Sequence, residues 1–487
     1  MFTNFDIKNT KYDTDTIERL TLYEDYRNLY NGDFAKAFSS TILKIRKRYP
    51  LDNTVAQSLI NVNLFWALTD FFKGFLTNQG ITVNVDDDKQ TVWDEIAKNN
   101  NFISVLKEVY IDNSRFGNGL FKVALVDGEV KVFSVCPDCW IPVFNQGNLN
   151  DIEGHILVYP LKIIENGVKK EYKKVEKHHR GYVENEIWET NNGSFTRMLT
   201  EEEMSEFNTP LVEDFSDIWN GFLVFPAKNT TESDSYFGES DYKRCKSVVE
   251  EIMLTVSQNS KIINRHANPK LSGSEQNLEM NPVTNERIFP DSDFLKVGTD
   301  GVKPEYITAD LQADAIQKHV DMLMKFFYIL TKTPPQAYGL DISGNMSGES
   351  LRKIFIAALS KVDDIKQVSF TSVIQEVVNC VMAMNSTPVE SVNIAWGEPI
   401  PSDYSEMVDT ENSRVSAGTQ SKLTTIMTLD KVSEDDARKE LERIEEEKAE
   451  KMSLKDALTQ IGNERKAKET GNVAIVEEEN NISKNDI

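Results

Sequence analysis

Residues 332–349 read KTPPQAYGLDISGNMSGE, and this connector separates two apolar helical patterns. Large apolar side chains recur at helical spacing over residues 311–330. The pair Pro334-Pro335 then prevents that helix from continuing, because proline has no backbone N–H to donate. A second pattern, with apolar side chains every three or four positions, continues to Asn385, and a helix of that length spans roughly 55 Å. The connector therefore predicts a specific break between two long helices, although two core helices joined by a flexible loop would show the same periodicity.

The order of the segments around the connector is more specific than their periodicity. A helical pattern near residues 241–266 is followed by a segment rich in proline and glycine, and then by the two helices described above. The segments VNIAWGEPIPSD at 392–403 and VSAGTQS at 415–421 come after them. In this order the chain resembles the portal proteins of tailed bacteriophages, particularly those of siphophages of Gram-positive hosts. The resemblance covers most of residues 20–450.

The resemblance implies an α+β portal fold with a wing, a stem, a clip and a crown, built from long helices and antiparallel strands. Carried onto this sequence, it gives the N-terminal part of the wing (1–240), a stem helix (241–267), the clip (268–305), a second stem helix (306–332), a tunnel loop (333–347), the long wing helix with a closing strand (348–402) and the crown (403–450). The remaining residues, 451–487, are increasingly polar, and we expect them to form a disordered tail.

The N-terminal half is predicted to mix helices with antiparallel strands. The first forty residues are typical of a surface helix, and helices are expected at 58–76 and 102–114. Two short β patterns flank Asp127-Gly128, which predicts a hairpin. Further strands are expected at 156–159, 182–188, 195–199 and 222–225.

The composition restricts the function classes. The chain has 487 residues, enough for several subdomains, and its net charge of -24 disfavours a tight grip on a nucleic-acid backbone. Four cysteines in a chain of this length do not form a disulfide framework, so a reducing compartment fits. The start lacks a secretory signal pattern, and no apolar run approaches membrane-spanning length. We therefore expect a protein without a membrane segment.

No catalytic motif is recognisable. The Gly-x-x-x-x-Gly-Lys-Ser/Thr phosphate loop of an ATPase is absent, and residues 344–348, GNMSG, place the serine one position late for a hydrolase elbow. Paired carboxylates such as Asp363-Asp364 are expected on exposed helix surface. The sequence therefore predicts no catalytic residue, no metal and no cofactor.

Two polar motifs allow alternative interpretations. Cys136 and Cys139 have the spacing of half a zinc site or of a redox pair, but ordinary turn cysteines are the preferred interpretation, since no second pair exists. The basic run at 169–180 contains Glu171 and Glu176, which favours a solvated hairpin face over a patch that binds DNA.

The resemblance implies a portal vertex subunit: about twelve copies form a ring through which double-stranded DNA enters and leaves the capsid. The implied partners are the terminase large subunit, a head–tail adaptor, and the major capsid and scaffolding proteins. The implied location is the virion, after assembly in the host cytoplasm. The residues expected to line the channel or to form the tunnel loop are Lys325, Lys332, Pro334, Pro335, Gly339, Gly344 and Asn345. An intracellular scaffold or adaptor without a channel, and a nucleic-acid enzyme of unfamiliar type, are the alternatives.

Overall fold

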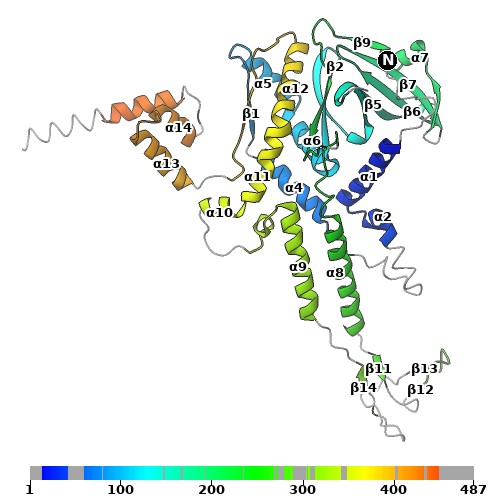
Figure 1. Cartoon of the computed structure of the whole chain (residues 1–487). Helices are drawn as coiled ribbons and strands as arrows, with labels where there is room; N and C mark the ends of the chain where they lie inside the picture. The colour runs from blue at the N-terminus through cyan, green and yellow to red at the C-terminus, as the bar shows by residue number, and fades with distance from the viewer. Residues whose placement is uncertain are drawn as a thin grey trace, which may run out of the picture. The chain divides into compact units, whose positions relative to one another are not determined.

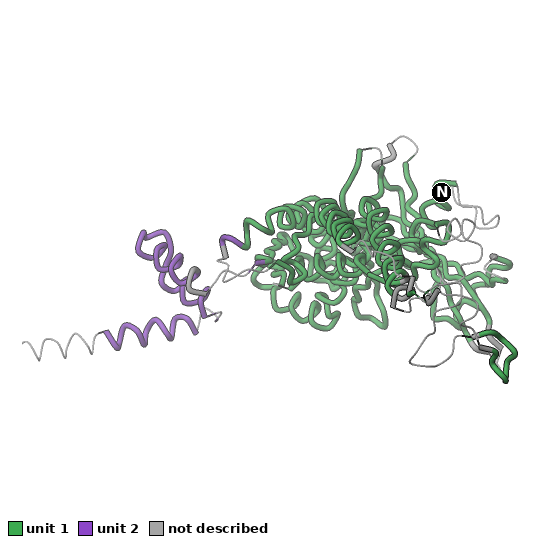
Figure 2. The backbone as a smooth tube through the Cα atoms, turned by 90° about the horizontal axis from the view of Figure 1, so that it is seen from below, with its two compact units in different colours: residues 1–345, 351–399 green, residues 346–350, 400–487 purple. Residues whose placement is uncertain are grey.

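The computed structural model describes residues 14–41, 60–78, 80–145, 148–165, 168–191, 194–233, 235–267, 270–272, 279–288, 303, 305–307, 313–341, 348–400, 404–430, 432 and 436–448. The fold is α+β. The chain divides into two compact units, one of residues 1–345 and 351–399, the other of residues 346–350 and 400–487 (Figure 2). The expected tail at 451–487 lies outside the described residues.

The helices and strands come in runs along the chain (Figure 1). The α-helices are α1 (Thr14–Asn31), α2 (Phe34–Ala37), α4 (Leu64–Thr77), α5 (Gln90–Asn99), α6 (Phe102–Phe116), α7 (Glu201–Ser205), α8 (Lys246–Ala267), α9 (Ala313–Thr331), α10 (Gly348–Ile354), α11 (Ile356–Ile365), α12 (Thr371–Met384), α13 (Tyr404–Ser416) and α14 (Lys422–Asp430). Two short 3₁₀ helices, η2 (Pro137–Cys139) and η4 (Pro335–Tyr338), and a π-helical turn, η5 (Lys366–Phe370), are also present, and residues 436–448 are helical.

The strands form small antiparallel sheets. The largest sheet orders β4 (Trp140–Asn145), β5 (Asn148–Glu165), β6 (Val168–His178), β7 (Tyr182–Asn191) and β8 (Ser194–Met198), with β9 (Val212–Asp214) paired to β7. The others are β10 (Val224–Lys228) with β2 (Asn118–Val126) and β3 (Glu129–Val135), β1 (Ile81–Asn84) with β15 (Asn393–Trp396), β11 (Lys270–Ser272) with β14 (Glu305–Ile307), and β12 (Glu279–Met280) with β13 (Arg287–Ile288).

The core of the first unit lies where α4, α6 and α12 pack with the β10–β2–β3 sheet. The predicted hairpin is confirmed: β2 pairs with β3, and Asp127 and Gly128 at its turn have φ of 53° and 82°. Positive φ at both central residues of a two-residue turn matches the right-handed twist of the flanking strands.

The first helix is a surface helix, as the sequence predicts, and it has one buried face. Tyr23, Tyr26 and Leu29 are buried on that face, whereas Leu22 is exposed. The Tyr23 ring lies 4.9 Å from the Phe116 ring. Helix α1 therefore covers α6 with an aromatic face that the alternation of charges hid.

The predicted single long helix is also interrupted. Helix α10 ends at Ile354, and Phe355 separates it from α11; the π-helical turn η5 then separates α11 from α12. The Phe355 ring stacks on Phe75 of α4 at 5.7 Å. In η5, Ser369 Oγ accepts a hydrogen bond from the Lys228 backbone N–H at 2.8 Å. Each interruption thus coincides with a tertiary contact, the first with α4 and the second with β10. Such contacts cannot be predicted from the periodicity of apolar residues along the chain.

Two helices begin later than predicted. Helix α4 starts at Leu64, where the Asn63 side chain caps it by accepting from the Trp66 N–H, and not near residue 58. Helix α8 starts at Lys246 and not at Asp241, because residues 241–245 form turns in which Tyr242 and Cys245 are buried and Asp241 accepts a hydrogen bond from Ser114.

The basic run is only partly a solvated hairpin face: β5 and β6 form the hairpin, and Lys170, Glu171 and Arg180 are exposed. It forms β6, which has neighbours on both sides in the largest sheet, and Glu176 and His178 are buried there. Lys122 Nζ lies 2.6 Å and Lys174 Nζ 2.9 Å from the Glu176 carboxylate. Burial alone would raise the pKa of Glu176, but the hydrogen bond from His178 and the charges of the two lysines hold it well below its ordinary value.

The second unit is helical in its described residues. Helices α13 and α14 are joined through Gly418 and Ser421, and the Ser421 hydroxyl accepts from the Thr424 N–H at the start of α14. Residues 436–448 are helical, and Ala437 is buried, so this charged helix is packed along one side.

A close backbone approach fixes the connection between β10 and α8. Gly117 has φ of 83°, and a Cβ added there would lie 2.1 Å from the carbonyl oxygen of Gly238. Gly128 has nearly the same φ, 82°, but open space around the same position. Substitutions at the two glycines can therefore be compared. Both would have the free-energy cost of a left-handed backbone, and only the one at Gly117 would add the cost of a steric clash.

We predict that Gly117→Ala destabilises the first unit by at least twice as much as Gly128→Ala, which should cost about 1–2 kcal/mol from backbone strain alone. Urea unfolding followed by circular dichroism measures both. Equal losses for the two variants would show that the approach of Gly117 to Gly238 is not tight.

Candidate functional site

Helices α8 and α9 lie side by side and are joined at their far ends by short β ribbons (Figure 1). Strand β11 follows α8 and pairs with β14, which precedes α9, with Ser272 opposite Glu305. His319 of α9 lies 3.7 Å from the Glu251 carboxylate of α8. The two helices therefore form an antiparallel hairpin whose tip contains the second ribbon, β12–β13.

Helix α9 has three distinct faces. Leu323, Phe327 and Thr331 are buried within the unit. A second face is exposed and polar and contains Lys318 and Lys325, seven residues apart; Lys332 follows seven residues later, just beyond the helix. Among the described residues, these three lysines have no ion-pair partner.

The third face of α9 is exposed and apolar. Its members are Met322, Phe326, Ile329 and Leu330, which are 44%, 46%, 72% and 42% exposed. We call these four residues the α9 stripe. An apolar face open to water is unusual on a helix that already buries another face, so the α9 stripe is a candidate contact surface.

The end of α9 is closed by its own backbone. Lys332 has φ of 57°, the Lys332 N–H donates to Ile329 O at 3.3 Å, and the Thr333 N–H donates to Tyr328 O at 3.1 Å. This pair of bonds satisfies the last helical carbonyls, usually with glycine at the left-handed position. The helix therefore ends at Thr331, before Pro334 and Pro335.

The first half of the expected tunnel loop is packed. Thr333 is buried and its hydroxyl bonds that of Thr331 at 2.6 Å. Residues Pro335–Tyr338 form η4, and the Tyr338 ring lies 6.2 Å from Phe71 and 6.3 Å from Tyr328. Gly339 follows with φ of 74° and open space around it. Gly344 and Asn345 lie outside the described residues.

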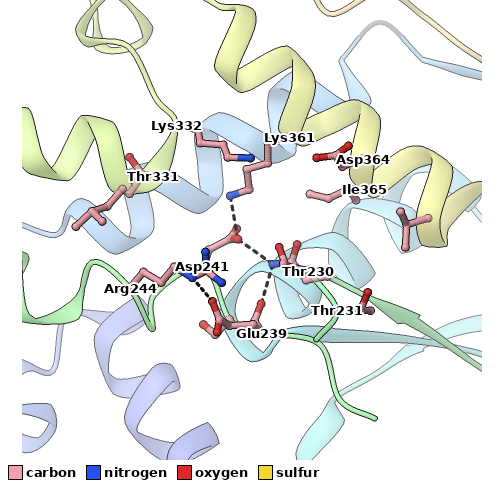
Figure 3. Close-up of a pocket in the computed structure, with 14 residues that line it drawn as sticks. Thr230, Thr231, Glu239, Asp241, Arg244, Thr331, Lys332, Lys361, Asp364 and Ile365 are labelled. Carbon is pink, nitrogen blue, oxygen red and sulfur yellow. Dashed lines mark hydrogen bonds and ion pairs between the residues drawn. The ribbon is translucent and has the colours of Figure 1, made fainter. Parts of the chain in front are cut away.

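A cavity of about 270 Å³ lies between the end of α9, the segment before α8 and the α11–η5 region (Figure 3). Lys361 Nζ lies 2.9 Å from Asp241 Oδ1, and the two side chains are only 12% and 5% exposed. Arg244 is paired with Glu239 at 2.5 Å. Leu330, Lys332 and Val368 also line this cavity. We call it the α9–α11 pocket.

A sequence model of the family described as "Phage portal protein, SPP1 Gp6-like" matches residues 9–454. The chain belongs to this portal protein family. A search of curated proteins gave no match.

Three solved structures are distantly similar to this chain. A chain of the "Neck of empty GTA particle computed with C6 symmetry" has 9% identity and a TM-score of 0.43 over 78% of this chain and 93% of that one. A chain of the "Virion of native gene transfer agent (GTA) particle" has 9% identity and a TM-score of 0.37, with 77% and 89% covered. A chain of the "Neck of native GTA particle computed with C12 symmetry" has 10% identity and a TM-score of 0.39, with 77% and 89% covered. The family assignment rests on the sequence model.

As a portal protein, the chain is a virion component and a subunit of the portal vertex, the ring-shaped conduit by which DNA enters and leaves a phage capsid. The family is structural, and a scaffold without a channel is not favoured. Within the described residues, no helix has both the length and the apolarity needed to cross a bilayer.

Sequence reasoning missed two parts of this site. It named Lys325 and Lys332 but not Lys318, although the seven-residue spacing of the three lysines is visible in the sequence. It also missed the α9–α11 pocket, because Asp241 and Lys361 are separated by more than a hundred residues and no local pattern joins them.

The cysteine pair lies in a turn around η2. Arg27 donates to the Cys136 sulfur at 3.5 Å and to Asp138 at 2.5 Å. Burial, reinforced by Asp138 and other nearby negative charge, raises the pKa of both Cys136 and Cys139 to about 12. The described residues contain no group of three or more His, Cys, Asp or Glu side chains that could hold a metal. In the folded protein both cysteines are therefore buried thiols in a turn.

We predict that the native protein reacts with iodoacetamide at pH 8 on the order of 10³-fold more slowly at Cys136 and Cys139 than the urea-unfolded chain, because a raised pKa leaves little thiolate in the folded state. The rate at each cysteine is measured by mass spectrometry. Rapid native labelling at pH 8 would contradict the raised pKa, and the unfolded chain supplies the control.

Proposed function

We propose that about twelve copies of this chain close into a ring whose DNA channel is lined by the polar face of α9. The observation that carries this proposal is the line of Lys318, Lys325 and Lys332, exposed and without ion-pair partners among the described residues. Free cations on one side of a helix are suited to brief contacts with phosphates. Negative-stain images of the purified protein test the ring, and compact single particles at every salt and protein concentration would refute it.

The charge balance favours sliding over gripping. Ring symmetry would turn each lysine into a circle of positive charge, and successive circles would lie about 10.5 Å apart at 1.5 Å per residue. Asp314 and Asp321 are exposed on the same face and dilute the attraction. Because each persistent phosphate contact adds affinity, a few lysines on a chain of net charge -24 let DNA pass with little friction.

The connector after α9 supplies the adjustable part of the channel in this proposal. The packed η4 segment anchors its start on α4, so movement begins at Gly339, where a left-handed backbone and open space coincide. Gly344 is proposed as the second hinge and Asn345 as a loop residue that faces DNA. Pro334 and Pro335 set the direction in which the chain leaves α9.

The tip of the α8–α9 hairpin, residues 268–305, is proposed to dock the terminase large subunit and later the head–tail adaptor. Met280 and Val283 in its second ribbon are 59% and 90% exposed, which supports a contact role. The outer surfaces would meet the major capsid and scaffolding proteins. We propose no catalytic activity for the chain itself, and assembly in the host cytoplasm.

We predict that the double variant Lys318→Ala/Lys325→Ala forms rings but fills capsids with DNA poorly. For binding of short duplex DNA to purified rings, the slope of log affinity against log salt should fall by about one for each phosphate that the variant no longer neutralises. Lys98→Ala is the matched control, because Lys98 is exposed on α5, away from the hairpin. An unchanged slope and normal filling would rule out α9 as the channel wall.

Replacing Gly344 should likewise spare the ring and impair DNA filling if the connector is the tunnel loop. Lys332 is less informative alone, because it also lines the α9–α11 pocket. Loss of ring assembly in the Gly344 variant would show that the loop assignment is wrong.

We predict that replacing residues 273–304 by Asn-Gly abolishes terminase binding while the chain still folds. Ser272 and Glu305 face each other across β11 and β14, so a two-residue turn can close this ribbon. Co-purification with the terminase large subunit measures binding, and circular dichroism checks the fold. Undiminished terminase binding would place the docking surface elsewhere.

A further inference from the structure

We propose that the α9 stripe, together with the α9–α11 pocket at its end, is the surface on which the neighbouring copy of this chain docks in the ring. This inference rests on the proposed channel and adds what that proposal leaves open, namely which surface of the subunit its neighbour covers. The stripe consists of Met322, Phe326, Ile329 and Leu330, and Leu330 also lines the pocket. The surface is therefore continuous from the helix to the cavity.

The direction of the stripe selects its occupant. Consecutive residues of an α-helix are about 100° apart around the axis, so Phe326 points about a quarter turn away from Lys325. If Lys325 faces the channel axis, Phe326 and Leu330 face sideways along the ring, whereas Ile329, one helical turn after Lys325, lies at the edge between the channel and the neighbour. In a closed ring the sideways direction leads to the next copy, so neither the DNA nor the terminase would reach this face.

The exposure of the stripe gives the driving force. Covering a large aliphatic or aromatic side chain is favourable, roughly in proportion to the apolar area that is removed from water. Ile329 is 72% exposed and Val368, at the mouth of the pocket, is 61% exposed. A subunit alone leaves these side chains in water, and assembly removes them from it.

The interior of the pocket indicates what the neighbour inserts. Asn229 is 3% exposed and donates to Glu239 O at 3.1 Å and to Asp241 Oδ1 at 2.8 Å. Both of its donors are thus used, yet its Oδ1 is buried without a hydrogen-bond partner in the described structure. Because this oxygen is closed to solvent, the inserted side chain does not reach it. The polar wall of the pocket is thus already assembled, and an inserted side chain with a polar end suits it.

The charges that line the pocket leave room for such a group without a new counter-ion. Lys361 is paired with Asp241, and Arg244 is paired with Glu239 and Glu232. Lys332 and Asp364 are exposed at the pocket, one of each sign. A neutral donor, or a lysine or arginine close to Asp364, would therefore satisfy the site (Figure 3).

The test uses two single substitutions in the full chain, Phe326→Asp in the stripe and Val368→Asp at the pocket. Each places a charge where the neighbour would bury an apolar side chain. The protein concentration at which half of the chains are in rings should rise at least about tenfold. Leu125→Asp is the matched control, because Leu125 is 51% exposed on β2, outside this surface. Light scattering measures assembly, and thermal unfolding checks that the separated chains fold.

A second measurement identifies the occupant directly in assembled rings. The photo-reactive variant Val368→p-benzoylphenylalanine should give a covalent dimer of the chain on irradiation, and mass spectrometry should find the cross-link between two copies. Cross-links confined to one chain, or rings that form at unchanged concentration in both aspartate variants, would overturn the inference while leaving the proposed ring intact. Wild-type chains that never form rings would overturn the proposed function as well.

Discussion

The interaction on which the rest of the site depends is the buried ion pair between Asp241 and Lys361. The Asp241 carboxylate also accepts from the Ser114 hydroxyl at 2.7 Å and from the Asn229 amide at 2.8 Å. These partners come from α6, from the segment after β10 and from α11, so one carboxylate joins three parts of the unit just before α8 begins. Removing one charge of such a pair costs roughly 3–5 kcal/mol, because the other is left buried and unpaired. The start of the α8–α9 hairpin is thereby fixed to the core.

A second constraint comes from helix α4, which contacts the hairpin both where it begins and where it ends. Thr69 of α4 bonds the Tyr242 hydroxyl at 2.7 Å and the Ser114 hydroxyl at 3.0 Å, next to the Asp241 group. The ring of Phe71, also on α4, lies 6.2 Å from the rings of both Tyr338 and Phe355. Helix α4 therefore anchors both the beginning of α8 and the segment that follows α9. The residues on both sides of the α8–α9 hairpin are thus held by one helix of the core.

The three faces of α9 differ in their surroundings. Leu323 and Phe327 hold it to its own subunit, Lys318 and Lys325 stay in water, and Phe326 remains apolar and uncovered. A helix with two partners and one solvent face needs about two thirds of its circumference apolar, which is more than a surface helix of a monomer shows. In the sequence alone, that width looks like a buried core helix. Because its third face is exposed in the structure, α9 is not a buried core helix.

The sequence by itself determined the chain's α+β class, the turn at Asp127-Gly128, the end of α9 before Pro334 and the order of segments that is typical of portal proteins. These features follow from residues close together along the chain, where periodicity, turn chemistry and proline act. Only the tertiary structure decided the break at Phe355, the burial of Tyr23 and Glu176, the pairing of Asp241 with Lys361 and the pocket beside it. Each of these depends on groups that are far apart in sequence and are brought together by packing, so their free energies are set by burial and by partners that no local pattern contains.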